Sequence, residues 1–334
     1  MRKIKIAQIG VNTNSHSNEI FGSIKSQNDI FDVVGYVLPE NERERLPEKL
    51  KFYDGCKELT LEEVLNNPEI EAVTIETDEV YLVKYAIMAA KAGKHIHMEK
   101  PGGFSLTDFE ELLNIMRETK KVFHIGYMYR YNPCVAELLE KIQKGDLGEI
   151  ISVEAQMNCI HPTAVRKWLK TLPGGMMFFL GCHLVDLILQ IKGQPKRIIP
   201  YNKCTGYEET DSYDFGMAIF EYENGVSFVK TTACEIGGFA RRQLVVSGTK
   251  GTVELKPFEM FAEGGNQYTS KTEYFSFDWG DMGNKTDTKS YNRYHPMMRS
   301  FAEMVRGEKQ NPYTLDYELE LYKTVLKACG NNDE

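Results

Sequence analysis

The first 126 residues repeat one pattern, in which a short apolar segment is followed by a turn and then by a segment with helical spacing. Thr60 with Glu63 and Thr107 with Glu110 are capping boxes that open two of the helical segments. Strands that alternate with helices in this rhythm form a parallel sheet. The pattern therefore predicts a doubly wound α/β domain over residues 1–126, with strands at 3–10, 32–38, 72–77, 95–99 and 122–126.

The rest of the chain is rich in strand-like segments with short connections. Asn224-Gly225 separates two of them and is a strong signal for a type I′ β-hairpin. We expect a polar loop at 161–172 and no regular pattern at 263–292. A single core rarely grows beyond about 250–300 residues, so we predict a second domain at 127–334 whose final helices pack back on the first. Its expected strands are 150–158, 197–203, 214–222, 226–234, 243–247 and 252–255, and its expected helices are 133–145, 176–191, 297–305 and 315–327.

Composition excludes several classes of function. The net charge of −8 argues against nucleic acid or an anionic membrane as the main partner. The opening segment does not have the pattern of a signal peptide, and no apolar run approaches the roughly 18 residues of a membrane span. The seven cysteines are scattered and never spaced CxxC. We therefore expect a cytoplasmic protein without disulfides or a zinc ribbon.

The turn after the first strand is a candidate phosphate-binding loop. Strand, tight polar turn and helix form the opening of a dinucleotide-binding unit. Of the glycines in a GxGxxG motif only Gly10 is present, and Asn12 and Ser15 occupy the other two positions. Asn tolerates a left-handed backbone and Ser is small, so the loop could still present its N–H groups to a pyrophosphate. An ordinary strand–helix turn is the alternative. The candidate cofactor-binding residues here are Gly10, Asn12, Thr13, Asn14 and Ser15.

The ends of the second and third strands supply two further candidates for cofactor binding. A carboxylate after the second strand normally binds the adenosine ribose. Here that strand ends at Leu38, and Glu40 is the nearest carboxylate. Arg43 and Arg45 follow and could meet a 2′-phosphate, although a solvated charge run explains them as well. NAD and NADP therefore both remain open, and Thr77 at the end of the third strand is the other candidate.

The segment Lys94–Gly103 places an ammonium group at the carboxyl end of a buried strand. Glu99, Lys100 and Pro101 follow strand 95–99 directly, and open α/β sheets bind their ligands at this edge. Lys100 is therefore a candidate catalytic residue, and all three residues are candidates for cofactor contact. His95 and His97 share one strand face, which could suggest a metal. No third ligand is suitably spaced, so we expect structural histidines and no metal.

Four ordered blocks of sequence resemble the glucose–fructose oxidoreductase, inositol dehydrogenase and MocA family of NAD(P)-dependent oxidoreductases. The tripeptide Glu99-Lys100-Pro101 alone would be a coincidence, but its order and distance relative to the other blocks are specific. The blocks are Ile9-Gly10, Ala89–Pro101, Gly126–Pro133 with the letters GYMYRYNP, and Pro173–Asp186 with the letters PGGMMFFLGCHLVD.

This resemblance implies an N-terminal Rossmann domain, followed by an α/β domain with a large open, mostly antiparallel sheet. That sheet commonly serves for dimerisation, so a homodimer or homotetramer is expected. In the family, the Lys of the tripeptide touches the nicotinamide ribose and the substrate hydroxyl, and the Lys–Pro bond is often cis. The family histidine that handles the substrate proton matches His183. Three polar family positions are apolar here, at Leu38, Leu82 and Phe179.

A secondary alcohol loses a hydroxyl proton when its hydride moves to NAD(P)⁺, and a nearby base accelerates this step. We expect Lys100 to hold the substrate oxygen, Glu99 to position Lys100, and His183 to act as acid and base. Phe179 replaces the family carboxylate four residues before His183, so Tyr129, His161 or Lys100 alone could provide another proton path. Candidate substrate contacts are Tyr129, Arg130, Trp168 and His183.

Three functions remain open at this point. The first is a sugar, inositol or polyol dehydrogenase that acts on a small carbohydrate-like substrate. The second is an enzyme that retains its cofactor and cleaves a glycoside by transient oxidation followed by elimination. The third is a catalytically inactive nucleotide-binding or regulatory protein, with which the three lost polar positions are consistent.

Overall fold

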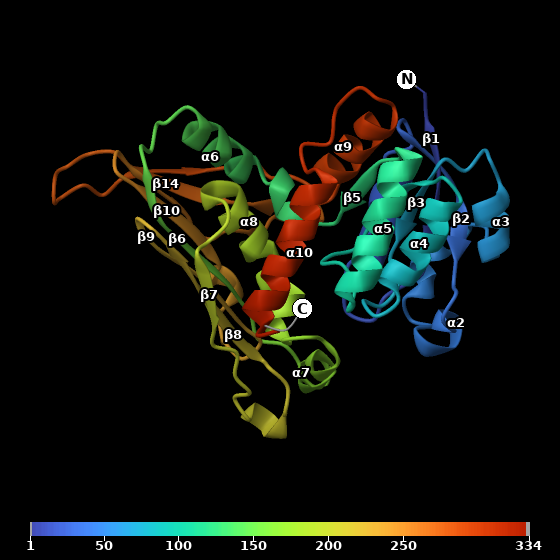
Figure 1. The fold of residues 1–334 in the computed structure, drawn as a ribbon, viewed down its shortest axis with the longest axis horizontal. Helices are drawn as coiled ribbons and strands as arrows, with labels where there is room; N and C mark the ends of the chain where they lie inside the picture. The colour runs from blue at the N-terminus through green and yellow to red at the C-terminus, as the bar shows by residue number, and fades with distance from the viewer. Residues whose placement is uncertain (1, 332–334) are drawn as a thin grey trace. The chain divides into compact units, whose positions relative to one another are not determined.

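The computed structural model describes residues 2–331, and these form two compact units. Unit 1 comprises the chain up to Met128 together with Tyr294–Tyr322. Unit 2 comprises Tyr129–Arg293 together with the chain from Lys323 onward. In Figure 1 the chain is coloured from blue at its beginning to red at its end, and the last two helices, α9 and α10, are drawn at the red end of the scale.

Unit 1 contains a parallel sheet of five strands within the described residues, in the order β2-β1-β3-β4-β5. The chain runs from β1 outward to β2 and then returns to β3 on the other side of β1. The strand order therefore reverses at β1, and ligands bind beside the carboxyl ends of strands at such a reversal. The doubly wound prediction is confirmed. The strands are β1 Ile4–Ile9, β2 Phe31–Val37, β3 Ala72–Ile75, β4 His95–Met98 and β5 Phe123–Ile125.

Capping residues set where two helices of unit 1 begin. Thr60 and Glu63 form the predicted capping box at the start of α3. The predicted cap at Thr107 is wrong, because the Ser105 side chain accepts the N–H of Asp108 and starts α5 two residues earlier than expected. The helices of unit 1 are α1 Ser17–Ser26, α2 Glu42–Arg45, α3 Leu61–Asn66, α4 Leu82–Lys91, α5 Leu106–Thr119 and α9 His295–Val305.

Unit 2 is built on a sheet that has eight strands in the part of the chain described, in the order β15-β14-β11-β10-β6-β9-β8-β7. Only β6 and β9 are parallel neighbours, so the predicted large, mostly antiparallel sheet is confirmed. Helix α8, Cys182–Lys192, packs on β6 and β9. The strands are β6 Ile150–Asn158, β7 Arg197–Pro200, β8 Phe215–Tyr222, β9 Gly225–Thr232, β10 Gln243–Gly248, β11 Thr252–Leu255, β14 Ser270–Tyr274 and β15 Asn284–Asp287.

Further elements complete unit 2. A small two-stranded sheet is formed by β12 Met260–Phe261 and β13 Gln267–Tyr268. Segment 263–292, for which the sequence showed no regular pattern, thus contains β13, β14 and β15. Helix α6 is Pro133–Gln143. Helix α10 is Leu315–Cys329, and it is divided between the units, because unit 1 extends to Tyr322 and unit 2 resumes at Lys323.

Two helical segments of unit 2 differ from the prediction. The expected loop 161–172 contains α7, Thr163–Trp168, because Arg166 is buried there and donates to the carbonyl of His161 and to Glu208. The helix expected at 176–191 begins with a π-helical turn, Met177–Gly181, before α8 starts at Cys182. A π turn contains an extra residue, so it changes which side chains upstream share the face of His183.

The hairpin between β8 and β9 is confirmed, but its predicted turn type is wrong. Tyr222 pairs with Gly225, so Glu223 and Asn224 form the turn, and neither has the positive φ that type I′ requires. Gly225 is needed for another reason. A Cβ on it would lie 2.2 Å from the carbonyl oxygen of Ile151 on the neighbouring strand.

This close approach predicts opposite effects for two glycine substitutions. Gly225→Ala should lower the free energy of unfolding by about 1–3 kcal/mol, because the new methyl group forces two strands apart. Gly22→Ala is the control, since Gly22 is an exposed position of α1 with no atom within 4 Å of the added Cβ. It should stabilise the protein by about 0.5–1 kcal/mol. Urea denaturation measures both, and equal effects of the two substitutions would contradict the account.

Candidate active site

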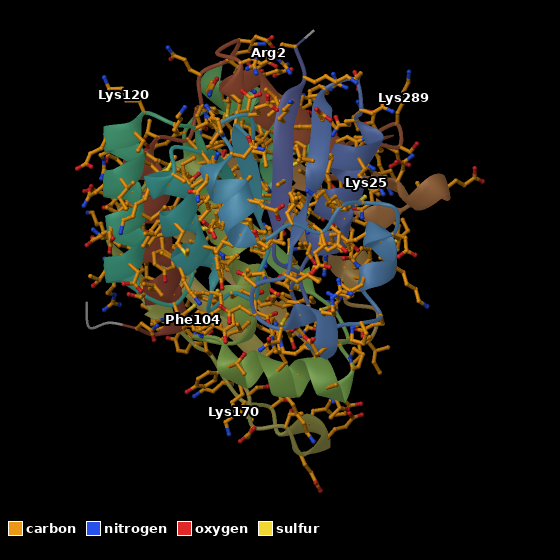
Figure 2. The ribbon with its side chains drawn as sticks, turned by 90° about the vertical axis from the view of Figure 1, so that its right-hand side faces the viewer. Arg2, Lys25, Phe104, Lys120, Lys170 and Lys289 are labelled. Carbon is orange, nitrogen blue, oxygen red and sulfur yellow. The ribbon has the colours of Figure 1, made fainter. Side chains whose placement is uncertain are left out.

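Lys100 is a buried lysine directly after β4. Its side chain is 1% exposed, whereas the lysines labelled in Figure 2, Lys25, Lys120, Lys170 and Lys289, are on the surface. Its Nζ lies 3.5 Å from Oε1 of Glu99. The Lys100–Pro101 peptide is cis, as the resemblance implies. The strand end thus holds one ammonium group out of water and next to a carboxylate.

Two more glutamates are buried in unit 1 close to this pair. Glu76 follows β3, Glu79 begins the connection to α4, and Glu99 follows β4, all three no more than 2% exposed. Burial raises the pKa of each of them, that of Glu99 to about 7, while the charge of Lys100 acts in the opposite direction. Neither carboxylate oxygen of Glu76 has a hydrogen-bond partner among the described residues. The group therefore holds protons that carboxylates in water would release at neutral pH.

The loop after β1 brings three of its predicted cofactor residues together with Thr77, which follows β3. Gly10 has φ +88°, and a Cβ on it would lie 2.3 Å from Cγ2 of Thr77, so the loop and the end of β3 are in tight contact. Asn12 is buried, and its Oδ1 accepts the backbone N–H of Ser15 at 3.0 Å. The Ser15 hydroxyl donates to Glu79 at 2.7 Å. This loop is therefore tied to the glutamate group that surrounds Lys100.

The loop has two features that phosphate binding needs, a backbone N–H donor and a nearby positive charge. Asn14 is only half-buried, and Nζ of Lys49 brings a positive charge to the carbonyl of Asn12 at 2.5 Å. The backbone N–H of Thr13 donates to the carboxylate of Asp78 at 2.6 Å. Backbone N–H groups of such loops are the donors that bind phosphate. A pyrophosphate on this loop must therefore replace the Asp78 carboxylate.

Asp78 and Glu79 are not among the predicted site residues, although both stand in the acidic run Glu76–Glu79 directly after β3. The run was a usable signal, because carboxylates at that strand end lie next to the β1 loop in this topology.

Glu40, Arg43 and Arg45 all have ionic partners within unit 1. Glu40 accepts from Lys84 at 2.7 Å and from the Tyr85 hydroxyl at 2.5 Å. Arg45 pairs with Asp78 at 2.8 Å, and Arg43 pairs with Glu58. Each of these three charged side chains is thus engaged by a neighbour in unit 1.

His183 lies in the first turn of α8 in unit 2 and is 1% exposed. The ring of Tyr129 packs against it edge to face, with ring centroids 5.0 Å apart and planes at 89°. The Tyr129 hydroxyl donates to Glu259, which also binds Arg242 and Arg293. Burial raises the pKa of Tyr129, so the phenol remains a donor. A buried ionic cluster thus fixes the ring that contacts His183.

Arg130 has a partner that favours a structural role over a direct substrate contact. Its Nε and Nη2 bind the two carboxylate oxygens of Asp186 at 3.0 and 2.8 Å, and both residues are buried. A bidentate pair of this kind fixes both side chains. It ties the segment after Met128 to α8 one turn beyond His183.

Trp168 packs on Phe179, the residue that stands where the resemblance leads us to expect a carboxylate. The two rings are 5.0 Å apart at 81°, and the ring of His161 lies 6.0 Å from Phe179. Burial, together with the charges of Arg242 and Arg166, lowers the pKa of His161 to about 4. His161 is therefore a neutral imidazole at pH 7.

The Glu259 cluster was not predicted, because its members are far apart in the chain. Tyr129, Arg242, Glu259 and Arg293 are spread over more than half of unit 2 in the chain and meet only through the fold.

Two buried histidines of unit 1 contact each other. His97 and His124 share a hydrogen bond of 2.8 Å between their Nδ1 atoms, and burial lowers the pKa of His97 to about 3. No set of three or more His, Cys, Asp or Glu side chains within residues 2–331 is placed to hold a metal. Nor does any helix in that range combine the length and apolarity needed to cross a membrane.

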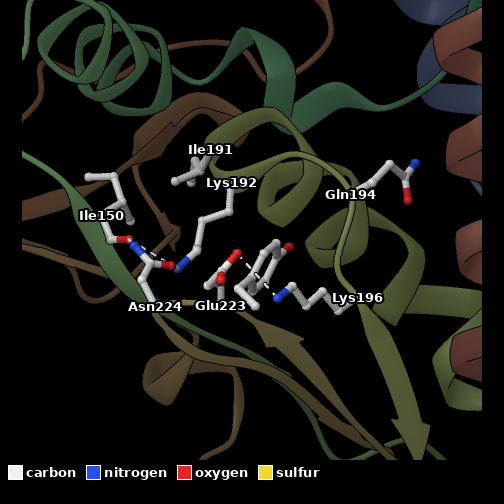
Figure 3. Close-up of a pocket in the computed structure, with 8 residues that line it drawn as sticks. Ile150, Ile191, Lys192, Gln194, Lys196, Glu223 and Asn224 are labelled. Carbon is white, nitrogen blue, oxygen red and sulfur yellow. Dashed lines mark hydrogen bonds and ion pairs between the residues drawn. The ribbon is translucent and has the colours of Figure 1, made fainter.

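A cavity of about 420 Å³ lies in unit 2 beside the end of α8 (Figure 3). Nζ of Lys192 donates to the carbonyls of Ile150 and Ile151 at 3.0 and 2.8 Å and to Oδ1 of Asn224 at 3.2 Å. These bonds tie α8 to β6 and to the β8–β9 turn. None of the predicted site residues lines this cavity.

Family models match both units of the chain. The model described as "Oxidoreductase family, NAD-binding Rossmann fold" matches residues 4–127, and the "GFO/IDH/MocA C-terminal domain" matches residues 135–254.

Three curated relatives align with large parts of the chain. "Uncharacterized oxidoreductase YhhX" of Escherichia coli is 30% identical over 41% of this chain and 40% of its own length. "scyllo-inositol 2-dehydrogenase (NADP(+)) IolW" of Bacillus subtilis is 24% identical over 66% and 61%. "Trans-1,2-dihydrobenzene-1,2-diol dehydrogenase" of Bos taurus is 26% identical over 80% of both chains. The chain thus spans less than two thirds of the first two.

Two solved structures share the fold over nearly the whole chain. Aldose-aldose oxidoreductase from Caulobacter crescentus, complexed with glycerol, has a TM-score of 0.79 at 16% identity, covering 99% of this chain and 97% of that chain. Levoglucosan dehydrogenase, in complex with NADH and levoglucosan, has a TM-score of 0.77 at 16% identity, covering 99% and 98%.

The raised pKa of Glu99 predicts how stability depends on pH. The unfolded chain releases this proton near the ordinary value of 4.5, whereas the folded chain keeps it to about 7. Between these values the folded state binds more protons, so stability falls as pH rises. Glu99→Gln cannot ionise, and its free energy of unfolding should fall less steeply across this window. Urea denaturation at several pH values measures the slopes. Glu62→Gln, at an exposed position of α3, should keep the wild-type slope, and a Glu99→Gln slope parallel to wild type would contradict the account.

The contact between Thr13 and Asp78 predicts the effect of a neutral replacement. Asp78→Asn removes a negative charge from the phosphate-binding loop, so NADH or NADPH should bind about tenfold more tightly. Fluorescence titration of the reduced cofactor measures this affinity. Asp54→Asn, at an exposed position of the same unit, is the control and should bind as wild type does. Unchanged or weaker binding by Asp78→Asn would show that the carboxylate does not compete with phosphate.

Proposed function

The chain belongs to the Gfo/Idh/MocA family of NAD(P)-binding oxidoreductases, and from this we propose that it transfers a hydride between NAD(P) and a secondary alcohol of a sugar, inositol or related polyol. The observation that carries the proposal is the buried ammonium of Lys100 at the carboxyl end of β4, beside Glu99. An open α/β sheet binds its ligand at this edge.

Lys100 stabilises the substrate oxygen in this proposal. As hydride leaves the carbinol carbon, negative charge develops on the hydroxyl oxygen, and a fixed positive charge in a site that excludes water stabilises it strongly. Glu99 keeps the ammonium in place, because a lysine without a carboxylate partner would be costly to bury. Bound nicotinamide supplies the hydride acceptor. Gly10, Asn12, Thr13 and Ser15 would hold its pyrophosphate.

His183 takes up and returns the hydroxyl proton in this proposal. Tyr129 fixes the face of its ring, and the Glu259 cluster fixes Tyr129. Phe179 stands four residues before His183 in place of a carboxylate, so no Asp at that position raises the basicity of the imidazole. We assign the proton to His183, which would act without help from a carboxylate at position 179.

The aromatic side chains of unit 2 and the names of the relatives both support a cyclic substrate with hydroxyl groups. Trp168 and Phe179 offer an apolar ring surface in unit 2, and the faces of cyclic polyols are apolar while their rims carry hydroxyls. The relatives are named for scyllo-inositol and for a dihydrobenzene diol, and a fold neighbour contains levoglucosan. All three compounds carry secondary hydroxyls on a ring. A cyclic polyol or anhydrosugar is the class to test first.

The experiment is a pair of assays on wild type, Lys100→Met and Lys91→Met. NAD⁺ and NADP⁺ are first titrated separately, and then cyclic polyols, anhydrosugars and glycosides are screened for formation of reduced cofactor. Lys100→Met should lower kcat by about 10²–10⁴-fold, while cofactor affinity stays within a few fold. Lys91→Met, an exposed position on α4, should behave as wild type.

Other outcomes separate the alternatives. Equal turnover by wild type and Lys100→Met would remove Lys100 from the mechanism. Purified protein that already absorbs as bound nicotinamide and cleaves glycosides without added cofactor would identify the elimination reaction instead. Cofactor binding without turnover of any alcohol would identify a regulatory member of the family.

A further inference from the structure

Two carboxyl groups and an imidazole share one face of the parallel sheet of unit 1, at its carboxyl edge. His97 pairs with Thr74 across β3 and β4. Because side chains alternate along a strand, Glu76 and Glu99, two residues further on, point to the same face as this pair. Nε2 of His97 lies 3.7 Å from Oε1 of Glu76. All of these side chains are buried, so the edge holds two glutamates on neighbouring strands with a histidine behind them.

The charge of Lys100 can balance only one of the two carboxyl groups. Its Nζ lies 3.5 Å from Oε1 of Glu99, whereas neither oxygen of Glu76 has a hydrogen-bond partner in the part of the chain that the structure describes. A buried carboxylate without a partner is unfavourable, so the proton stays on Glu76. A neutral carboxylic acid therefore stands next to a buried ion pair, at the edge of the sheet where the ligand binds.

The groups around Glu76 favour its neutral form, with one exception. Burial is the main cause that raises the pKa of Glu76, and Lys100 lowers it. Three carboxylates raise it further, those of Glu99, Glu19 and Glu79. Burial keeps Tyr53 protonated, and it lowers the pKa of His97 to about 3, so both are neutral at pH 7. From α9 the ring of Phe301 packs against His97 at 5.9 Å. Among these groups only Lys100 is positively charged.

The histidine pair behind Glu76 is compatible with both protonation states of that residue. The Nδ1 atoms of His97 and His124 are 2.8 Å apart, so one of them carries a hydrogen and the other accepts it. When His97 donates, its Nε2 is an acceptor that faces a carboxylic acid at Glu76. When His124 donates, Nε2 of His97 carries the hydrogen and faces a carboxylate. A change of tautomer thus lets Glu76 lose or gain a proton while both imidazoles stay neutral.

The nicotinamide changes its charge by one unit in the proposed reaction. The ring is positive in NAD(P)⁺ and neutral in NAD(P)H. An oxidised ring near Lys100 places two positive charges together, so a second carboxylate beside Glu99 becomes favourable. With the reduced ring the same carboxylate has no charge to compensate. This step rests on the proposed function for the position of the nicotinamide, but it needs no alcohol substrate.

We propose that Glu76 is protonated when NAD(P)H is bound and ionised when NAD(P)⁺ is bound, so that its carboxylate compensates the positive ring. When NAD(P)⁺ binds, the O–H bond of the acid breaks, the electron pair stays on the carboxylate oxygen, and the proton passes to the buffer. When the ring becomes neutral by accepting hydride, Glu76 takes up a proton again. The role of Glu76 is thus distinct from that of Glu99, which remains beside Lys100.

The first test compares the affinities of the oxidised and reduced forms of the same nucleotide by calorimetric titration between about pH 6 and pH 8, without an alcohol. The ratio of the two dissociation constants, oxidised over reduced, should fall at least about fivefold across this range in wild type, because only the oxidised form releases a proton on binding. Titration of the phosphates cancels in this ratio, since both forms carry them. Glu76→Gln cannot release the proton, so its ratio should change less than about twofold.

Glu19→Gln is the matched control for the first test. It removes an exposed negative charge of α1 that acts on Glu76 but is not proposed to exchange a proton, and it should keep the wild-type fall. A wild-type ratio that does not depend on pH, or a fall of equal size in Glu76→Gln, would overturn the proposal. Turnover of an alcohol without this pH dependence would overturn the role of Glu76 and leave the proposed function standing. The pH dependence without turnover would support Glu76 and remove the proposed function.

The second test detects the proton on Glu76 directly. Infrared difference spectra between the NAD(P)⁺ and NAD(P)H complexes report the carbonyl stretch of a protonated carboxylic acid, which a carboxylate lacks. The oxidised complex of wild type and of Glu19→Gln should lose this band, and the difference spectrum of Glu76→Gln should not contain it. An oxidised wild-type complex that keeps the band, or a band difference that persists in Glu76→Gln, would overturn the proposal.

Discussion

The proposed chemistry of this protein depends on one buried charge. Lys100 is held out of water at the end of β4, and Glu76, Glu79 and Glu99 are buried near it in the same unit. Burying an ammonium group without a carboxylate costs several kcal/mol, and burying three ionised carboxylates with a single ammonium is also unfavourable. The raised pKa of the glutamates resolves this conflict, because protons neutralise part of the negative charge. The positive charge of Lys100 is thereby compensated only in part, which leaves it available to an oxygen that gains negative charge.

Unit 2 likewise contains buried charged groups that are paired with groups of opposite charge. Glu259 is buried between Arg242 and Arg293 and accepts the hydroxyl of Tyr129, whose ring packs on His183. Asp186 holds Arg130 in a bidentate pair one turn further along α8. Tyr129 is thus fixed by a buried ionic group, and its ring in turn packs on His183. Phe179 and Trp168 bring apolar surface to the region where the family resemblance leads us to expect a carboxylate.

The repeating pattern of the first half was enough to predict the parallel sheet, because apolar strands and capping residues are local signals. Lys100 could be predicted for the same reason, since its position depends only on the strand before it. Other features depend on contacts far apart in the chain. The buried Arg166 stabilises α7 through Glu208. Position 225 requires a glycine because the backbone of Ile151 lies against it, not because of the turn before it. The hydrogen bond from Thr13 to Asp78, and the convergence of four residues on Glu259, could not be read from local spacing.

The most direct measurement of the central claim is a crystal structure of the protein with NAD⁺ or NADP⁺ and an alcohol that it binds. The account predicts Nζ of Lys100 within hydrogen-bond distance of the substrate hydroxyl, about 2.6–3.2 Å, with Glu99 still beside the ammonium. A complex in which Lys100 contacts only Glu99, while the reacting hydroxyl is bound by other groups, would contradict it.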